Sequence, residues 1–143
     1  MEQIPGIAYL HPLWQFAALI WGLYVAALAL PNIDNPNFKV RRHERHGRIL
    51  LIMILAGAVF GRLSSASLPQ GTFRMPGHIF MTVFIVALVI IGAIFGYQGG
   101  RLRLRTRTGM MRAHPWFVIL VLALMFAQAL IGIGSKGLRL IKF

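Results

Sequence analysis

The chain contains no cysteine and only three acidic residues, Glu2, Asp34 and Glu44, among 143 residues. The absence of cysteine excludes disulfides, thiolate-held iron–sulfur clusters and c-type haem attachment within this chain. The sequence also lacks a nucleotide-binding motif. If the protein takes part in an enzymatic reaction, the catalytic subunit is therefore expected to be another polypeptide.

Charged residues are scarce as well, at 13% against 57% hydrophobic residues. So few charges do not cover a soluble globule of this length, and the length corresponds to one domain, residues 1–143. A net charge of +12 favours nucleic-acid binding in a soluble protein. Here the basic residues lie between long apolar stretches, so we expect a lipid bilayer as partner and no nucleic acid.

Long apolar runs dominate what is present. A membrane-spanning helix needs about 20 mostly apolar residues. Four segments meet this requirement: residues 12–30, 47–64, 78–98 and 114–134. Short connections favour antiparallel neighbours, so the predicted fold is an all-α, integral membrane, up-down-up-down four-helix bundle. The first ten residues carry no basic region, so the first stretch is expected to act as an uncleaved insertion signal.

Positive charge is distributed unequally between the two sides of this predicted bundle. Ten basic residues follow the first or the third stretch: Lys39, Arg41, Arg42, Arg45, Arg48, Arg101, Arg103, Arg105, Arg107 and Arg112. The other side has five: Arg62, Arg74, Lys136, Arg139 and Lys142. Because short basic loops stay in the cytoplasm, both termini are expected outside.

Four of the five histidines open the four stretches, and each has a small residue eighteen positions later. The pairs are His11 and Ala29, His43 and Gly61, His78 and Gly96, and His114 and Gly132. Eighteen steps of about 100° return to the same helix face, and at ~1.5 Å per residue they span ~27 Å, close to the hydrocarbon thickness. Each helix thus offers an imidazole at its entry and a small residue at its exit.

Position +14 after each histidine lies only about 40° from the same face. The residues there are Val25, Gly57, Gly92 and Gln128. Such faces suit two planar cofactors stacked along the bundle axis, bordered by Gly57, Gly61, Gly92, Gly96 and Gly132. Gln128 either bonds haem or quinone or links helices.

The predicted topology sorts the histidines into an outer set, His11 and His78, and an inner set, His43, His46 and His114. Imidazole is a usual ligand of haem iron, and bundle cores hold such sites. We expect His11 with His78, and His43 with His114, as axial ligands of two haem irons. An iron with both axial positions filled favours electron transfer over catalysis at the metal.

His43 and His46 compete for one ligand position, because they lie three residues apart on one helical face. The Arg-x-His entry and the glycine at +18, both shared with His114, favour His43. The other imidazole is left for a haem propionate or a quinone head group.

Arginines flank the predicted haem positions, and their guanidinium groups suit carboxylates such as haem propionates. Candidates are Arg41, Arg42, Arg45 and Arg112 at the inner face and Arg74 at the outer face. For each of them, the alternative is that it only follows the positive-inside distribution.

At these residues the chain resembles the cytochrome b561-type superfamily of membrane dihaem proteins, closest to a bacterial four-helix branch of unknown function. The motifs are His11-Pro12, His43-x-x-x-Gly47, Pro76-Gly77-His78, Arg112-x-His114 and Gln128-x-x-x-Gly132. The resemblance covers residues 9–134. It implies two b-type haems that pass electrons across the bacterial inner (cytoplasmic) membrane, often between a quinol and a partner redox protein.

The leading functional interpretation is therefore a dihaem cytochrome b that anchors a respiratory oxidoreductase and conducts electrons between quinone or quinol and a partner redox subunit. The exposed basic loops would offer that subunit a docking surface. Two alternatives stay open: an autonomous quinone-linked haem oxidoreductase, and a haem-free structural subunit of a membrane complex.

Overall fold

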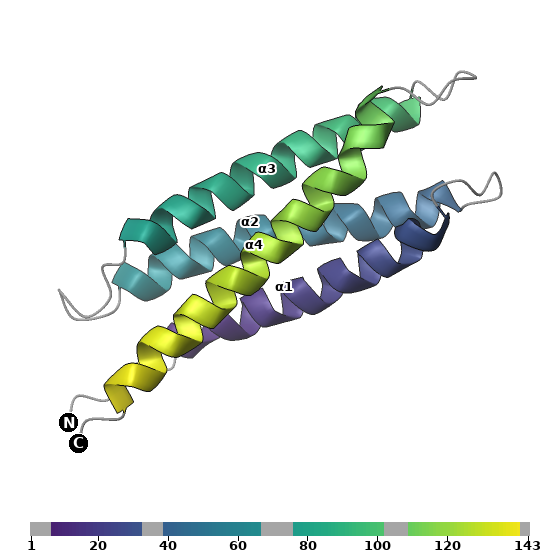
Figure 1. Ribbon diagram of the computed structural model, residues 1–143. Coiled ribbons are helices and arrows are strands. Elements are labelled where there is room, and N and C mark those ends of the chain that lie inside the picture. The colour runs from purple at the N-terminus through teal and green to yellow at the C-terminus, as the bar shows by residue number, and fades with distance from the viewer. Residues whose placement is uncertain (1–6, 33–38, 67–75, 102–108, 141–143) are drawn as a thin grey trace.

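The computed structural model describes residues 7–32, 39–66, 76–101 and 109–140, and in these ranges the backbone is helical apart from Lys39. The elements are α1 (Ile7–Ala29), a 3-10 turn η1 (Leu30–Asn32), α2 (Val40–Ala66), α3 (Pro76–Arg101) and α4 (Gly109–Leu140). Figure 1 shows the four helices running roughly side by side, with the start of α1 and the end of α4 at the same end of the bundle. The prediction of an all-α chain with four long apolar helices is confirmed.

The helices form two closely packed hairpins, α1 with α2 and α3 with α4, and fewer contacts join α1 to α4 and α2 to α3. The start of α1 lies on the end of α2, where His11 contacts Gly61. At the opposite end of this hairpin Arg42 of α2 reaches Tyr24 of α1. Helices α1 and α3, like α2 and α4, face each other across the bundle.

Three helices start at least five residues before the apolar stretches that predicted them. Helix α1 begins at Ile7 rather than residue 12, α2 at Val40 rather than residue 47, and α4 at Gly109 rather than residue 114. The segment 41–48 is polar, but Arg and Glu are good helix formers, and Glu44 pairs with Arg48 at i,i+4. The bounds of the apolar stretches thus marked only the expected membrane spans, and the helices extend beyond these bounds.

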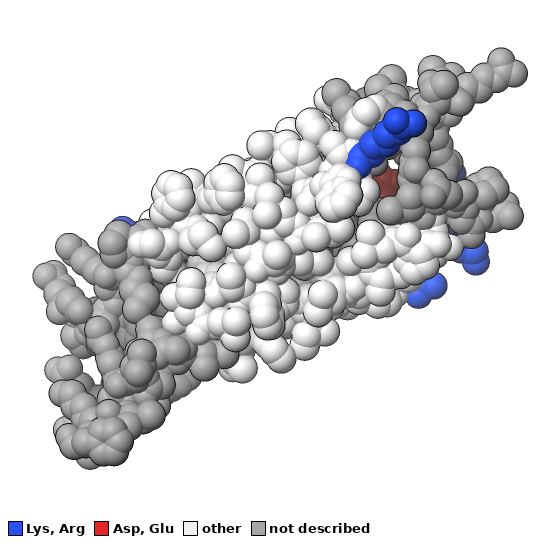
Figure 2. Space-filling view, viewed as in Figure 1, with Lys and Arg blue, Asp and Glu red and all other residues white. Residues whose placement is uncertain are grey.

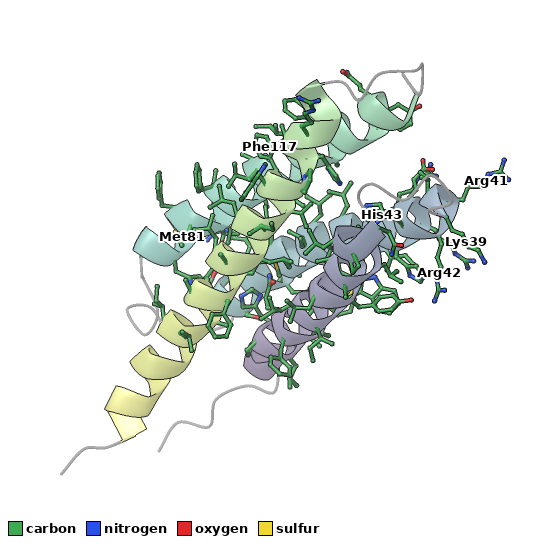
Figure 3. All side chains as sticks on the ribbon, turned by 45° about the vertical axis from the view of Figure 1, so that its right-hand side comes forward. Lys39, Arg41, Arg42, His43, Met81 and Phe117 are labelled. Atoms are coloured by element: carbon green, nitrogen blue, oxygen red, sulfur yellow. The ribbon has the colours of Figure 1, made fainter. Side chains whose placement is uncertain are left out.

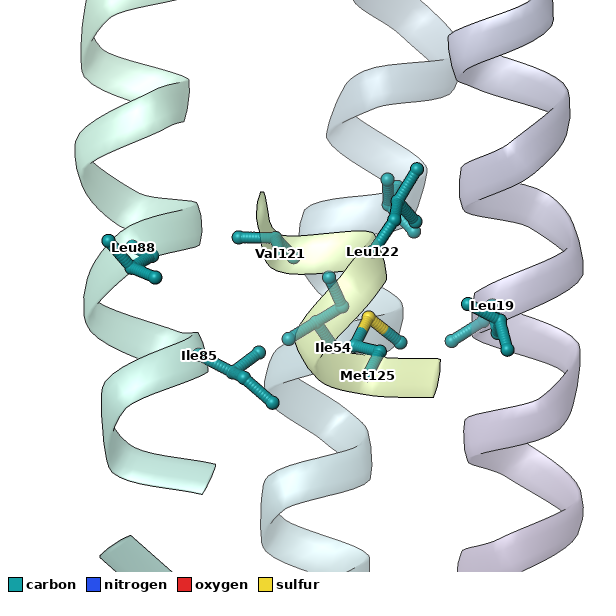
Figure 4. Packing of buried hydrophobic residues seen from close by; sticks show 9 residues of the cluster. Leu19, Ile54, Ile85, Leu88, Val121, Leu122 and Met125 are labelled. Carbon is teal, nitrogen blue, oxygen red and sulfur yellow. The ribbon is translucent and has the colours of Figure 1, made fainter. Parts of the chain in front are cut away.

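The buried core lies in the middle of the bundle. Its members come from all four helices: Ala18, Leu19, Leu50, Ile54, Ile85, Leu88, Val121, Leu122 and Met125. Figure 4 shows Ile54 and Met125 between Ile85 on one side and Leu19 on the other. Ile54 is 2% exposed, the lowest value among the bulky members. This apolar layer separates the two ends of the bundle, where the histidines lie.

Most apolar side chains face outward instead of into this core. In the four candidate spans only 17–28% of the most apolar window is buried inside the protein. Leu13, Phe80 and Trp116 are 68%, 71% and 71% exposed. On the face in Figure 2 the central band carries neither basic nor acidic residues, and the charged side chains lie toward its ends. Exposed apolar area on this scale marks a multi-pass membrane protein.

Gly22 is a close-approach point in this packing. A methyl carbon there would lie 2.5 Å from Cδ2 of Leu122 and 3.5 Å from Cδ1 of Leu50. We expect Gly22→Leu to lower the free energy of unfolding by about 1–3 kcal/mol through overpacking. Thermal unfolding in detergent, followed by circular dichroism, measures this.

The matched control is Gly47→Leu, because nothing lies within 4 Å of a methyl carbon at Gly47. Its stability should stay within about 0.5 kcal/mol of the parent, as at most surface positions. Equal melting temperatures for the two variants would contradict the assignment of Gly22 as a packing contact.

Candidate cofactor sites at two histidine pairs

The first histidine pair, His11 of α1 and His78 of α3, joins the two hairpins at one end of the bundle. The ring centres lie 6.1 Å apart and the ring planes are inclined by 83°. Nδ1 of His11 donates a hydrogen bond to the carbonyl of Gly57 at 3.0 Å. A methyl carbon at Gly61 would lie 2.8 Å from Cε1 of His11. The imidazole therefore rests directly on the glycine backbone of α2.

The second histidine pair, His43 of α2 and His114 of α4, repeats this arrangement at the other end. Its ring centres are also 6.1 Å apart, with the planes inclined by 80°. Nδ1 of His114 donates to the carbonyl of Gly92 at 2.8 Å. A methyl carbon at Gly96 would lie 2.9 Å from Cε1 of His114. Both pairs are the ones expected from the sequence.

The two remaining rings are also supported from position +14 of a neighbouring helix. The backbone of Val25 lies next to the His43 ring. Gln128 Nε2 lies 3.3 Å from the ring nitrogens of His78, and it donates to the Thr82 hydroxyl at 2.8 Å and to the His78 carbonyl at 3.2 Å. Every ring of the two pairs thus contacts the other helix of its hairpin, at the residue that lies fourteen positions after the histidine of that helix.

The ring separation fits two imidazoles on opposite sides of one metal ion. A metal–imidazole bond is about 2.0–2.1 Å long and the ring centre lies about 1.1 Å behind the nitrogen, which gives about 6.3 Å between ring centres. Metal-binding imidazoles usually donate their other N–H to a carbonyl or carboxylate. His11 and His114 do this through Nδ1, which leaves Nε2 as the nitrogen with a lone pair.

Two nitrogens per site are too few for a bare metal ion of ordinary coordination number. Within the described ranges no group of three or more His, Cys, Asp or Glu side chains is positioned to hold one. A macrocycle that brings its own equatorial ligands needs only the two axial positions from the protein. Two imidazoles per site therefore fit a metal held in a macrocycle better than a bare metal ion.

The two pairs lie at different depths in the bundle. His11 and Val25, which mark the two levels along α1, are fourteen residues apart. At ~1.5 Å rise per residue the levels are about 21 Å apart along the helix. This distance is smaller than the hydrocarbon thickness of about 30 Å, so both pairs fit within one bilayer.

His46 does not join either pair. Its ring packs against Trp21 and Tyr24 of α1, with ring centres at 5.3 Å and 5.2 Å. Its Nδ1 is buried and has no hydrogen-bond partner among the described residues. Arg42 closes this cluster by donating to the Tyr24 hydroxyl at 3.0 Å. The structure thus separates the two competing histidines: His43 faces His114, and His46 faces the aromatic side chains of α1.

The predicted arginines occupy different surroundings. Arg42 and Arg112 are exposed, at the end of the bundle that holds the second pair. Arg41 and Arg45 line a shallow hollow on the outside of α2 instead. Figure 3 shows Arg41 extending away from the bundle, while His43 lies nearer the other helices. Arg74 lies outside the described residues.

The small residues at the helix exits have a role that spacing alone did not reveal. They were expected to border cofactors, a prediction that stays open. In the structure Gly61 and Gly96 make room for the histidine rings of neighbouring helices. Gly57 lies under Gln15 and Trp14, and Gly92 lies under Phe117. The side-chain surroundings at Gly132 of α4 lie outside the described residues.

Several contributors to these sites were not predicted as site residues. Thr82 shares the Gln128 amide with His78, and its signal was the i,i+4 spacing from His78. Trp14 donates from Nε1 to the Met53 carbonyl at 2.7 Å, which fixes α1 beside Gly57. Tyr24 and Trp21 surround His46. These contacts join residues far apart in sequence, so spacing within one helix does not report them.

Comparison with known proteins identifies no relative. No family model matches the chain, and neither a curated protein nor a solved structure is significantly similar to it. The resemblance to the cytochrome b561-type superfamily rests on the short motifs quoted above. A functional interpretation therefore depends on the geometry of the histidine pairs.

Proposed function

We propose that this chain is a membrane dihaem cytochrome b that moves electrons between a quinone/quinol pool and a partner redox subunit. The observation that carries the proposal is the pair of 6.1 Å ring separations, one at each end of the bundle. Two equivalent pairs at separate depths favour a relay over a single reaction centre.

His11 and His78 would hold one b-type haem, and His43 and His114 the other. Such a haem supplies one-electron oxidation and reduction without an open coordination position. The protein's contribution is to hold the imidazoles: the carbonyls of Gly57 and Gly92 accept hydrogen bonds from Nδ1–H of His11 and of His114, and so fix which nitrogen of these two rings keeps its lone pair. Arg42 and Arg112, which are exposed at the end of the second pair, would be the guanidinium groups that bind haem propionates there.

The proposed placement is an up-down-up-down bundle in the bacterial inner membrane, with both termini on the periplasmic side. It rests on the alternation of basic and non-basic connections in the sequence. The first histidine pair would then lie toward the periplasm and the second toward the cytoplasm. A relay between them would cross most of the hydrocarbon layer.

Quinone exchange is proposed at His46. This imidazole carries a buried Nδ1 within an aromatic cluster, beside the second pair but outside it. An aromatic wall with one hydrogen-bonding nitrogen suits a planar quinone head group. The partner redox subunit is inferred from the sequence, because a chain without cysteine clusters or nucleotide motifs needs another protein to complete a reaction.

The cofactor content is the first test. Purified protein should contain two haems per chain by pyridine haemochrome assay, with low-spin b-type spectra. His78→Ala should retain one haem, because each pair serves one iron. A ratio near zero in the parent would refute the cofactor proposal, and loss of both haems from a folded His78→Ala variant would refute the pairing.

A second test separates the two neighbouring histidines. His43→Ala should lose the haem held with His114, while His46→Ala should keep both haems and lose reduction by quinol. Optical spectra report the haem content, and stopped-flow reduction by a soluble quinol reports the exchange. If only His46→Ala loses a haem, the ligand assignment is wrong.

A third test addresses the glycine contacts. In Gly96→Leu the added side chain meets the His114 ring, and overpacking of about 1–3 kcal/mol should displace that ligand. We expect loss or a changed potential of the haem at the second pair, with the other haem unchanged in a redox titration.

Gly109→Leu is the control for this variant, because nothing lies within 4 Å of a methyl carbon there. It should bind both haems with parental potentials. If Gly96→Leu behaves in the same way, the eighteen-residue spacing has no bearing on cofactor binding.

A further inference from the structure

The outer side of α2 carries basic and apolar side chains in one continuous line. A hollow of about 290 Å³ is lined by Arg41, Glu44, Arg45, Arg48, Ile49 and Ile52. The three arginines lie at i, i+4 and i+7, so they share one helix face. All three are exposed, and Arg41 extends away from the bundle in Figure 3.

The same face continues as an apolar surface toward the other end of α2. Ile52, Val59 and Leu63 follow Arg45 at +7, +14 and +18 and are 64%, 57% and 53% exposed. They belong to the span that is long and apolar enough to cross a membrane. A molecule that covers this line must be anionic at one end and apolar along the next turns.

We propose that this surface binds one anionic phospholipid. Its phosphate lies between Arg41 and Arg45, and one acyl chain lies along Ile49 and Ile52. Glu44 is paired with Arg48 at 2.5 Å, so this carboxylate is partly neutralised. Arg41 and Arg45 then supply the net positive charge of the hollow.

The dimensions agree with this occupant. A single leaflet is about 15 Å deep in hydrocarbon, half of a ~30 Å core. From Arg45, ten residues at ~1.5 Å each reach that depth near Leu55. Basic hollows at the cytoplasmic ends of membrane helices are typical contact sites for anionic lipid head groups. The hollow lies on the opposite side of α2 from His43, so the site is independent of haem binding.

The test uses the full-length protein, delipidated in detergent. Native mass spectrometry would count bound lipid during titration with phosphatidylglycerol, phosphatidylcholine of equal chain length, and inorganic phosphate. We expect one saturable phosphatidylglycerol, at least about tenfold weaker binding of phosphatidylcholine, and no retained phosphate. Equal binding of both lipids, or of phosphate alone, would overturn the proposal.

The triple variant Arg41→Gln, Arg45→Gln, Arg48→Gln should weaken phosphatidylglycerol binding by at least about tenfold. The charge-matched control is Arg103→Gln, Arg105→Gln, Arg107→Gln, which should leave that binding unchanged. An equal loss in both triple variants would mean that total charge, and not this hollow, attracts the lipid. Ile52→Ser keeps all charges and should weaken binding through the acyl contact, and an unchanged affinity would refute the proposed path of the chain.

Discussion

The arrangement of both candidate sites depends on an imidazole ring that rests on a glycine backbone of the neighbouring helix. A ring N–H without a partner is costly inside a membrane, so Nδ1 of His11 and of His114 needs an acceptor. Helical carbonyls have a second lone pair, but a side chain on the acceptor helix would keep the ring away. Gly61 and Gly96 leave the backbone open to that approach, and the carbonyls of Gly57 and Gly92 accept the hydrogen bonds.

These contacts relate the helices in a way that differs from the motifs that they share in sequence. By motif, α2 and α4 share an Arg-x-His entry and a glycine at +18. By contact, α1 corresponds to α4. In each of these two helices a histidine, which is followed by a proline in the sequence, donates a hydrogen bond to a glycine carbonyl of the neighbouring helix. Helices α2 and α3 supply the glycines. The second hairpin therefore repeats the first with the helix order reversed. Each histidine pair contains one ring that donates to a glycine carbonyl and one ring that does not.

The sequence predicted the four apolar helices and which histidines meet, because composition and an eighteen-residue period are properties of single helices. It did not predict the beginning of α2, since the polar turns from Arg41 to Arg48 carry no apolar signal. It favoured His43 as the partner of His114 but kept His46 as an alternative, because three residues separate the two histidines by only about 60° on a helix. In the structure His46 packs against Trp21 and Tyr24 of α1 while His43 faces His114, and such packing between helices has no signature in one stretch of sequence.

The two pairs are equivalent in their donors but not in their surroundings. His43 meets the backbone of Val25, whereas His78 meets the side-chain amide of Gln128, which also binds Thr82. Groups around a ligand tune the potential of a bound metal, so the proposed haems would differ in potential although each has two imidazoles. Of two such centres, the one with the higher potential would be the easier to reduce. The departure from symmetry at position +14 would thus determine which of the two proposed haems holds an electron more tightly.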